Sequence, residues 1–381
     1  MKKTIFAFCF ALAAVLPAFS QTTGSQAPAT PQPARPQQPP PIVSPEVHSD
    51  RRVTFRLRAP QAKEVSVSGE WAGGGKAVMT KDESGLWSVT VGPIEPDLYG
   101  YGFTVDGVGM LDPSNTFIKP MRSNRTSVLE VLADKPTLQD FQDVPHGAVH
   151  VHAYRSKAVG AVRSLHVYTP PGYDKNPSAR FPVLYLFHGS GDNDATWTAL
   201  GRAHFILDNL IAQGKAKPMV VVMTDGHAAP NTPEARGRNT EIFSRDLLGD
   251  VMPLVEASYR VKNDRLSRAI VGLSMGGGQS LTVGLNHLDL FAWVGAMSSA
   301  INAPEQTFAT ALGDAKATNA KLKLFWIAIG KDDFLLKTNQ QFDELLTAKG
   351  VKHTFKLTEG NHSWPVWRRY LVDFAPLLFT Q

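Results

Sequence analysis

The pattern of apolar and polar positions changes partway along the 381 residues. Between residues 46 and 135, short stretches such as VTFRLR, VSVSGEW and LWSVTV alternate in polarity and are separated by glycine, proline and aspartate. Alternation with a period of two is typical of strands that bury one face, and such frequent turns favour two packed antiparallel sheets. The pattern therefore predicts a small all-β sandwich over residues 46–135.

Residues 146–381 follow a different pattern. Nearly continuous apolar runs, among them FPVLYLF, MVVVM, AIVGL and LFWIAI, alternate with amphipathic stretches such as AHFILDNLIAQ and SRDLLGDVMPLVEASY. Strands that are apolar on both faces, separated by helices, indicate a mostly parallel sheet covered by helices on both sides. Ligands of such sheets bind at the carboxyl ends of the strands, so the chemistry is expected there.

The first residues have the composition of an export signal. Residues 1–20 combine two lysines, an apolar stretch and small residues before a cleavage point after Ser20, which predicts a signal peptide and a periplasmic or extracellular protein. Residues 21–45 are rich in proline and glutamine and are expected to be a disordered linker. The single cysteine, Cys9, lies within the predicted signal, so the mature chain would have no disulfide and no thiolate metal site.

Charge and hydropathy add little that would point to other functions. The formal net charge is +5, without a block of like charge, so nothing favours nucleic acid or an anionic membrane as a partner. Apart from the predicted signal, no apolar run approaches the length of a membrane span. The oligomeric state is left open by the sequence.

The stretch AIVGLSMGGGQS contains the strongest chemical motif. Ser274 occupies the central position of a G-x-S-x-G pattern, directly after a predicted strand and before a predicted helix. Small flanking residues, here Gly272 and Gly276, allow the sharp strained turn that exposes a nucleophilic serine, and the next two glycines would let the helix approach the sheet. A helix-capping serine is the structural alternative.

A serine nucleophile requires a base and an acid that orients the base. In this kind of fold both follow the serine, the acid first. Of the histidines after Ser274, only His362 lies in a loop between the last predicted strand and the last helix. The acid should follow the strand LKLFWIAIG, where Asp332 and Asp333 are adjacent, and we favour Asp333 because neighbouring carboxylates cannot both face one imidazole.

Two backbone N–H groups should stabilise the oxyanion. Met275, directly after the nucleophile, is expected to supply one, and Ser190 or Gly191, in the loop after VLYLFHG, the other. His188 ends the preceding strand and is expected to order this loop rather than to act as a base. No metal or organic cofactor is required by this set of groups.

The motifs YTPPGYD, FPVLYLFHGSGDNDATW, RAIVGLSMGG, IGKDDF and NHSWPVWRRYL, in this order, resemble carbohydrate esterase family 1, the bacterial feruloyl and acetyl xylan esterases. The resemblance covers residues 146–381 and implies an α/β hydrolase fold. Its catalytic serine, acid and histidine correspond to Ser274, Asp333 and His362. It implies that the chain forms an acyl-enzyme with feruloylated or acetylated xylan or arabinoxylan oligosaccharides, without metal or cofactor.

The earlier segment resembles the immunoglobulin-like N-terminal domains of glycogen-branching enzymes and isoamylases, the family 48 carbohydrate-binding modules. The motifs that carry the resemblance are VTFRLRAPQAKEVSVSGEW, GLWSVTVGPIEPDLYGYGFTVDG and LDPSN. The resemblance makes sugar binding a hypothesis. Trp71, beside the run AGGG, is the candidate platform for stacking on a sugar, with packing as the alternative, whereas Trp87 and Tyr101 are expected in the core. The stretch TLQDFQDVPHG (residues 137–147) connects the two segments, and so short a connection would let the module line the active-site cleft as well as bind polymer on its own.

The acyl group decides which esterase is implied. Trp197, Phe334, Trp364 and Trp367 lie near the predicted site and favour an elongated slot for a feruloyl group over a small site for acetate, although Trp367 also suits the core. An acetyl xylan esterase is the main alternative. A siderophore-ester hydrolase, a mycolyl transferase and a non-catalytic sugar-binding protein are further alternatives, and the esterified sugar stays open.

Overall fold

The computed structural model describes residues 41–123, 125–230 and 232–380. The predicted signal peptide and most of the predicted linker lie outside the described residues. Within them, no helix combines the length and apolarity that crossing a membrane would require. Residues Ile42–Gln381 form one compact unit.

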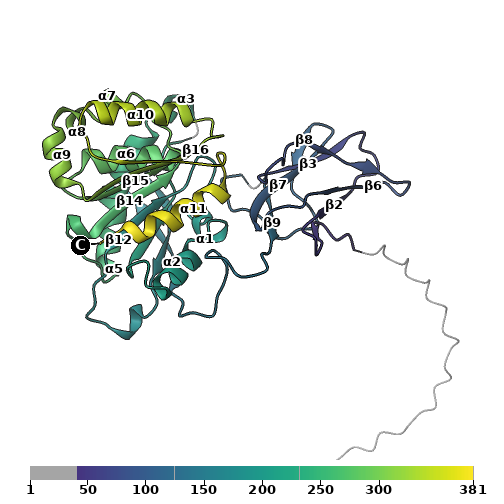
Figure 1. Cartoon of the computed structure of the whole chain (residues 1–381), viewed down its shortest axis with the longest axis horizontal. Coiled ribbons are helices and arrows are strands. Elements are labelled where there is room, and N and C mark those ends of the chain that lie inside the picture. Colours follow the sequence, from purple (N-terminus) through teal and green to yellow (C-terminus); the bar gives the residue numbers. More distant parts are fainter. Residues whose placement is uncertain (1–40, 124, 231, 381) are drawn as a thin grey trace, which may run out of the picture. The chain divides into compact units, whose positions relative to one another are not determined.

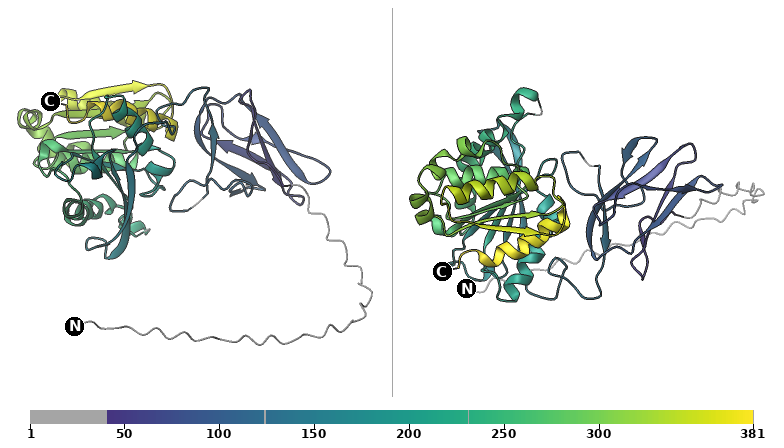
Figure 2. Two further views of the ribbon diagram at one scale, coloured as in Figure 1. Left: turned by 90° about the horizontal axis from the view of Figure 1, so that it is seen from below. Right: turned by 45° about the horizontal axis from the view of Figure 1, so that its top comes forward.

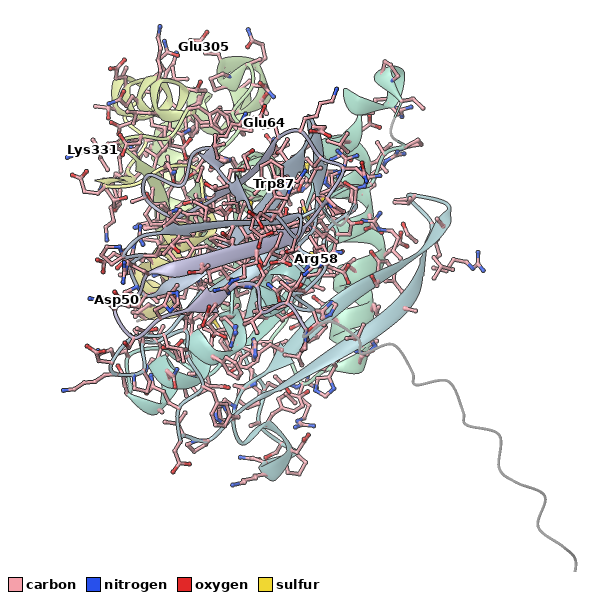
Figure 3. All side chains as sticks on the ribbon, turned by 90° about the vertical axis from the view of Figure 1, so that its right-hand side faces the viewer. Asp50, Arg58, Glu64, Trp87, Glu305 and Lys331 are labelled. Atoms are coloured by element: carbon pink, nitrogen blue, oxygen red, sulfur yellow. The ribbon has the colours of Figure 1, made fainter. Side chains whose placement is uncertain are left out.

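The first domain consists of two antiparallel sheets, as the alternating pattern predicts. The sheets have the strand orders β1-β2-β6-β5 and β4-β3-β7-β8, and β9 also pairs with β7. Their bounds are β1 (Glu46–Val47), β2 (Val53–Arg58), β3 (Val65–Gly69), β4 (Ala77–Val78), β5 (Thr80–Lys81), β6 (Leu86–Val91), β7 (Asp97–Val105), β8 (Val108–Met110) and β9 (Ser127–Val131). The expectation that Trp87 (Figure 3) and Tyr101 belong to the core is confirmed, since both are buried there.

Trp71 is buried in the same core, so the expectation that it offers an exposed sugar-stacking face is wrong. Only 7% of its surface is accessible. Its ring stacks on Phe55 with a centroid distance of 5.6 Å and an interplanar angle of 15°. The ring also fills the space where a side chain on Gly69 would lie. The run AGGG after Trp71 suggested exposure, but the indole folds back over the small residue at 69.

The second domain contains an eight-stranded sheet with the order β10-β11-β13-β12-β14-β15-β16-β17 (Figure 1). β10 and β11 are antiparallel to their neighbours, and the six strands from β13 to β17 pair in parallel. The bounds are β10 (Ala148–Ser156), β11 (Ala161–Thr169), β12 (Val183–Phe187), β13 (Val220–Thr224), β14 (Arg268–Leu273), β15 (Trp293–Met297), β16 (Leu324–Gly330) and β17 (Thr354–Thr358). This is the α/β hydrolase fold that the sequence predicts.

Helices cover both faces of this sheet (Figures 1 and 2). α2 (Ala203–Ala212) and α11 (Trp364–Phe374) pack on one face, whereas α4 (Asn239–Asp246), α5 (Met252–Ser258), α6 (Met275–Asn286) and α10 (Leu336–Ala348) pack on the other. Along β12 the side chains point alternately into the two cores, which explains why the strand is apolar at every position. The remaining helices are short: α1 (Thr196–Ala199), α3 (Pro233–Arg236), α7 (Pro304–Thr307), α8 (Ala309–Gly313), α9 (Ala315–Lys321), and the 3₁₀ turns η1 (Tyr173–Lys175), η3 (Arg265–Ser267) and η4 (Ala375–Leu377).

The predicted helix over residues 244–259 differs from expectation in one respect. A π-helical turn, η2 (Leu247–Val251), separates α4 from α5. Pro253 lies just after this turn, and a proline has no N–H and crowds the carbonyl one turn earlier. The widened turn relieves that crowding and so explains the π-helical geometry.

The two domains share buried contacts. Leu98 of β7 and Val128 of β9 belong to the core cluster that includes α2 and α11. The guanidinium of Arg368, buried on α11, donates to Asp97 Oδ1 at 2.7 Å and is enclosed by the first domain's backbone at Leu98. The β-sandwich is therefore packed against the hydrolase domain rather than connected to it by the chain alone.

Candidate active site

Ser274 lies in the sharp turn between β14 and α6. Its φ and ψ are 52° and −115°, a conformation that is strained for a residue with a side chain. A Cβ on Gly272 would lie 2.4 Å from the carbonyl oxygen of Gly276, so neither end of the motif tolerates a larger residue without movement. The Ser274 N–H donates to Met297 O at 2.8 Å, which attaches the turn to the end of β15.

The two further glycines let α6 begin close to the segment after β15, as predicted. A Cβ on Gly277 would lie 2.3 Å from Ser299 Oγ, and a Cβ on Gly278 would lie 2.2 Å from Ala300 O. α6 starts at Met275, so the N-terminus of the helix lies directly after the nucleophile. Such a helix start suits a developing negative charge.

His362 and Asp333 complete a hydrogen-bonded chain with Ser274. His362 Nε2 lies 2.9 Å from Ser274 Oγ, and His362 Nδ1 lies 2.8 Å from Asp333 Oδ2. Asp333 follows β16 and His362 follows β17, so both come from the carboxyl ends of strands, as the pattern predicts. Asp332 is exposed and its N–H binds Gly360 O, so of the two adjacent carboxylates it is Asp333 that faces the imidazole.

The environment of Asp333 favours its ionised form. Burial by itself would raise the pKa of this carboxyl, but hydrogen bonds from His362, from the N–H of Leu335 and from the hydroxyl of Ser298 lower it below its ordinary value. The carboxylate is thus held charged and oriented. A charged acceptor at Nδ1 keeps the proton there, which leaves Nε2 free to accept the serine proton.

The structure separates the two candidates for the second oxyanion donor. The N–H of Gly191 donates to His227 Nε2 at 2.9 Å and so is already engaged. Burial lowers the pKa of His227 to about 4, so this nitrogen accepts over most of the pH range. Gly191 is therefore excluded as a free donor, and Ser190 and Met275 are left as the candidate pair. Gly189 lies against the nucleophile, since a Cβ there would be 3.3 Å from Ser274 Cβ.

His188 orders the loop as expected. It is buried, and its Nε2 accepts the N–H of Gly226 at 2.8 Å while its Nδ1 contacts Gly189 O at 2.8 Å. These bonds join the ends of β12 and β13 beneath the candidate site. No hydrogen bond links His188 to Ser274 among the described contacts, so a role as a second base has no geometric support.

Three of the four aromatic residues predicted to line an acyl slot lie inside the domain, and the expectation is wrong for Trp197 and Trp364. Their accessible fractions are 1% and 0%, because their rings pack edge to face against each other at 5.0 Å. Trp367 is also buried, and its ring centroid lies 4.9 Å from that of His362. Phe334 is 75% exposed, with its ring centroid 4.4 Å from that of His362. Only Phe334 offers a surface to a ligand.

Ser298 was not anticipated from the sequence. It follows β15 with a positive φ of 46° and is fully buried. Its Oγ accepts the indole N–H of Trp367 at 3.1 Å, and its hydroxyl hydrogen-bonds Asp333. The strain at this position places a hydroxyl under the carboxylate. The sequence indicates a functional residue here only through two serines, the SS of MSSA, directly after a buried strand.

A cavity of about 960 Å³ adjoins Met275, the residue after the nucleophile. Its lining comes from α4, η2, α6 and the segment after β15, and includes Thr240, Ser244, Leu248, Met275, Ile301 and Phe308. Apolar and hydroxyl side chains share this lining with the charged side chains of Glu241 and Arg245. Within the described part of the chain, no three histidine, cysteine, aspartate or glutamate side chains gather as metal ligands would.

The sheet order, the strained serine turn and the order serine, acid, histidine define an α/β hydrolase. A family model described as Esterase matches residues 156–378, and the chain belongs to this family. An endo-1,4-beta-xylanase/feruloyl esterase from Xylanibacter ruminicola is 34% identical over 346 residues, which cover 88% of this chain and 46% of the relative. The chain thus spans about half the length of that relative. The resemblance to carbohydrate esterases seen in the sequence is confirmed.

Solved structures agree on the fold. A ferulic acid esterase with 26% identity covers 62% of this chain and 99% of its own, with a TM-score of 0.54. The enterobactin esterase from Shigella flexneri has 18% identity and a TM-score of 0.62, and the match covers 85% of this chain and 92% of that one. A match of that extent includes residues of the β-sandwich as well as the hydrolase domain of this chain.

Proposed function

We propose that this chain is a serine esterase that hydrolyses acyl esters on plant cell-wall xylan, feruloyl esters above all. The observation that carries the proposal is the hydrogen-bonded chain from Ser274 through His362 to Asp333 at the carboxyl edge of the sheet. Family membership supports the reaction class, and the relative from Xylanibacter ruminicola supports the substrate class. The complete chain of three groups argues against a non-catalytic sugar-binding protein.

The geometry supports a two-step reaction. His362 Nε2 takes the proton of Ser274 Oγ as the oxygen attacks the ester carbonyl carbon, and Asp333 stabilises the imidazolium. The N–H groups of Met275 and Ser190 stabilise the oxyanion of the tetrahedral intermediate. The C–O bond to the sugar then breaks, the sugar oxygen takes the proton from His362, and an acyl-serine is left. Water, deprotonated by the same histidine, releases the carboxylic acid and restores Ser274.

Two features support an aromatic acyl group. Phe334 presents an exposed ring beside His362, where it would stack on an aromatic acid or on the sugar that carries it. The cavity next to Met275, the residue after the nucleophile, has room for a planar acid. An acetyl xylan esterase is the second candidate, because the burial of Trp197 and Trp364 removes two of the side chains that favoured an aromatic slot.

Export belongs to the proposal as well. Residues 1–20 have the composition of a cleavable signal peptide, and xylan lies outside the cell, so the proposed substrate and the proposed location agree. Mass spectrometry of the mature protein would show a new N-terminus after Ser20. An intact Met1 on protein recovered from the cytoplasm would contradict export.

The substrate is tested by parallel assays with methyl ferulate, 4-nitrophenyl acetate and acetylated xylan. We expect the highest kcat/KM on methyl ferulate, and Ser274→Ala should abolish hydrolysis of all three. Phe334→Ala should raise KM for methyl ferulate by about two- to tenfold, the loss expected for one aromatic contact, and leave 4-nitrophenyl acetate nearly unchanged. Leu377→Ala, which alters another exposed apolar side chain, is the matched control. Release of acetate from xylan without turnover of methyl ferulate would favour the acetyl xylan esterase.

A further inference from the structure

A loop of the first domain pairs with the loop that borders Ser274. The β8–β9 loop (described residues 111–123, 125 and 126) belongs to the β-sandwich, and the β12–α1 loop (residues 188–195) contains the proposed oxyanion donor. Two contacts join the loops directly, the bridge between Met121 and Asp192 and the bond from Arg122 N–H to Gly191 O at 2.9 Å. A third follows at the start of α1, where Thr196 Oγ donates to Pro120 O at 2.8 Å. The outer side of the β12–α1 loop is therefore paired like a strand with the other domain.

A buried ion pair reinforces this contact. Lys119 Nζ lies 2.8 Å from Asp192 Oδ1, and the two side chains are only 10% and 5% exposed. The same ammonium lies 5.7 Å from the ring centroid of Trp364, so a cation–π contact covers its other side. Because so little water surrounds the pair, removal of one partner leaves the other charge buried and uncompensated.

The β8–β9 loop is itself held firmly by its own domain. Asp112, buried at its start, accepts hydrogen bonds from Ser44 Oγ at 2.6 Å and from Tyr101 Oη at 2.8 Å. Asn115 donates to Tyr101 Oη at 2.9 Å and to Val128 O at 2.8 Å. Lys119 therefore projects from a loop whose position is set by the sandwich core.

The inner side of the β12–α1 loop faces the nucleophile. Gly189 lies against Ser274, and the N–H of Gly191 is bound by His227. Ser190 lies between these two glycines, and its N–H shares a peptide unit with the carbonyl of Gly189, which accepts the N–H of Asp192 at 3.3 Å. The direction of the Ser190 N–H therefore depends on where Gly191 and Asp192 are held. Those are the two residues that the first domain contacts from the outside.

We propose that Lys119 is a positioning residue for catalysis: through Asp192, the β-sandwich holds the β12–α1 loop so that Ser190 N–H points at the oxyanion. The role rests on the proposed function, because Ser190 acts as a donor only if Ser274 attacks an ester. The first domain is then part of the catalytic machinery, whatever its affinity for sugar.

The test compares Lys119→Met with Glu130→Gln in the full chain. Glu130 also forms an ion pair across the two domains, with Arg202 at 3.1 Å, but it does not contact the β12–α1 loop. For each variant, kcat and KM are measured with 4-nitrophenyl acetate, the affinity for an alkylboronic acid is measured by calorimetry, and Tm is recorded. A boronic acid forms a tetrahedral anionic adduct with a nucleophilic serine, so its affinity reports the oxyanion site without an ester substrate.

For Lys119→Met we expect kcat to fall about tenfold or more with KM nearly unchanged, since a displaced donor costs less than the roughly hundredfold of a deleted one. The affinity for the boronic acid should fall by a similar factor, whereas Glu130→Gln should keep both values. Asp192→Asn, which keeps the shape of the side chain, should show a smaller loss in the same direction if Lys119→Met is too unstable to measure.

A lower Tm with unchanged kcat and boronate affinity would overturn the positioning role, as would equal losses in the Glu130→Gln control. A wild-type chain that binds the boronic acid but does not hydrolyse methyl ferulate would contradict the proposed substrate alone. The boronate comparison between variants would still decide the role of Lys119 in that case.

Discussion

Replacing Asp333 with asparagine should move the proton of His362 to the wrong ring nitrogen and so prevent it from acting as the base. The two side chains at position 333 have nearly the same shape. Asp333 Oδ1 accepts the N–H of Leu335 at 2.8 Å, and Oδ2 is the oxygen nearer to His362 Nδ1, also at 2.8 Å. An asparagine that keeps the bond from Leu335 must place its carbonyl at Oδ1, so its NH₂ group faces Nδ1. The imidazole then carries its proton on Nε2, which no longer accepts the proton of Ser274.

The expected magnitude follows from this geometry. Imidazole in the wrong tautomer cannot act as the base, and equivalent changes in serine triads lower kcat by about 10³- to 10⁴-fold. That loss corresponds to about 4–5.5 kcal/mol of transition-state stabilisation. Asp332→Asn is the matched control, because its exposed side chain does not contact the imidazole, and its kcat should stay within about twofold of the wild type.

The assay is steady-state hydrolysis of methyl ferulate by the wild type, Asp333→Asn and Asp332→Asn at one pH, with Tm measured for each. Ser274→Ala and His362→Ala should lose at least as much as Asp333→Asn, because the three groups act as a unit. If Asp332→Asn were the more damaged of the two, the assignment of the acid would be refuted. A near-normal kcat in Asp333→Asn would refute the role of the carboxylate itself.

Three further predictions concern the core, acid stability and cofactors. Trp71→Ala should lower the free energy of unfolding by about 3–5 kcal/mol, the range for losing a large buried ring. Any binding of xylo-oligosaccharides by the folded fraction should persist, and lost binding at an unchanged Tm would support sugar stacking on Trp71 instead. His227, with a folded pKa of about 4 against 6.5 unfolded, stays neutral when the unfolded chain takes up a proton, so stability should fall as pH drops from 6.5 toward 4. Tm measured against pH should decline less steeply in this window for His227→Gln, and an equal decline would contradict the assignment. Activity should survive both EDTA and thiol reagents, because no step uses a metal or cysteine; loss in EDTA that a divalent ion reverses would refute this.

The parts of the site that sequence could predict are those determined by local backbone geometry and chain order. The turn at Ser274 needs glycines at fixed positions whatever surrounds it, so its motif is readable without the fold. Asp333 and His362 follow from the order of strands, because parallel strands bring their carboxyl ends to one edge. The choice of Asp333 over Asp332 depended on which carboxylate faces inward, and the structure agrees with the prediction.

Burial was harder to predict, because it depends on packing partners far away in sequence. Trp197 and Trp364 fall near the site in the chain, yet their rings cover each other, and Trp364 also lies beneath Lys119 of the other domain. Ser190 and Gly191 are adjacent in the same loop, so the sequence cannot tell which N–H is the second oxyanion donor. The position of His227, which binds the N–H of Gly191, distinguishes them.

Strand β10 shows a further limit of prediction from apolar runs. It lies at the edge of the sheet, and much of its sequence AVHVHAYRS is exposed, so it lacks the continuous apolar run of the central strands. An edge strand with polar side chains on its open face resembles a loop when only apolar runs are counted. β10 is held in the sheet by its pairing with β11 over nine residues, and the sequence pattern does not indicate this pairing.

The packing of the two domains also changes what a truncation would show. From the short connection alone, deleting residues 21–135 is expected to spare small esters and to reduce activity mainly on arabinoxylan. The deletion, however, removes Asp97, the carboxylate paired with the fully buried Arg368, and it uncovers core side chains around α11. A buried cation without its partner costs several kcal/mol, a large share of the stability of a domain. We therefore expect the truncated chain to lose activity on methyl ferulate and arabinoxylan together, with a lower Tm. Full activity on methyl ferulate at an unchanged Tm would contradict this expectation. It would mean that the hydrolase domain needs the β-sandwich neither for its stability nor for the position of its catalytic loop.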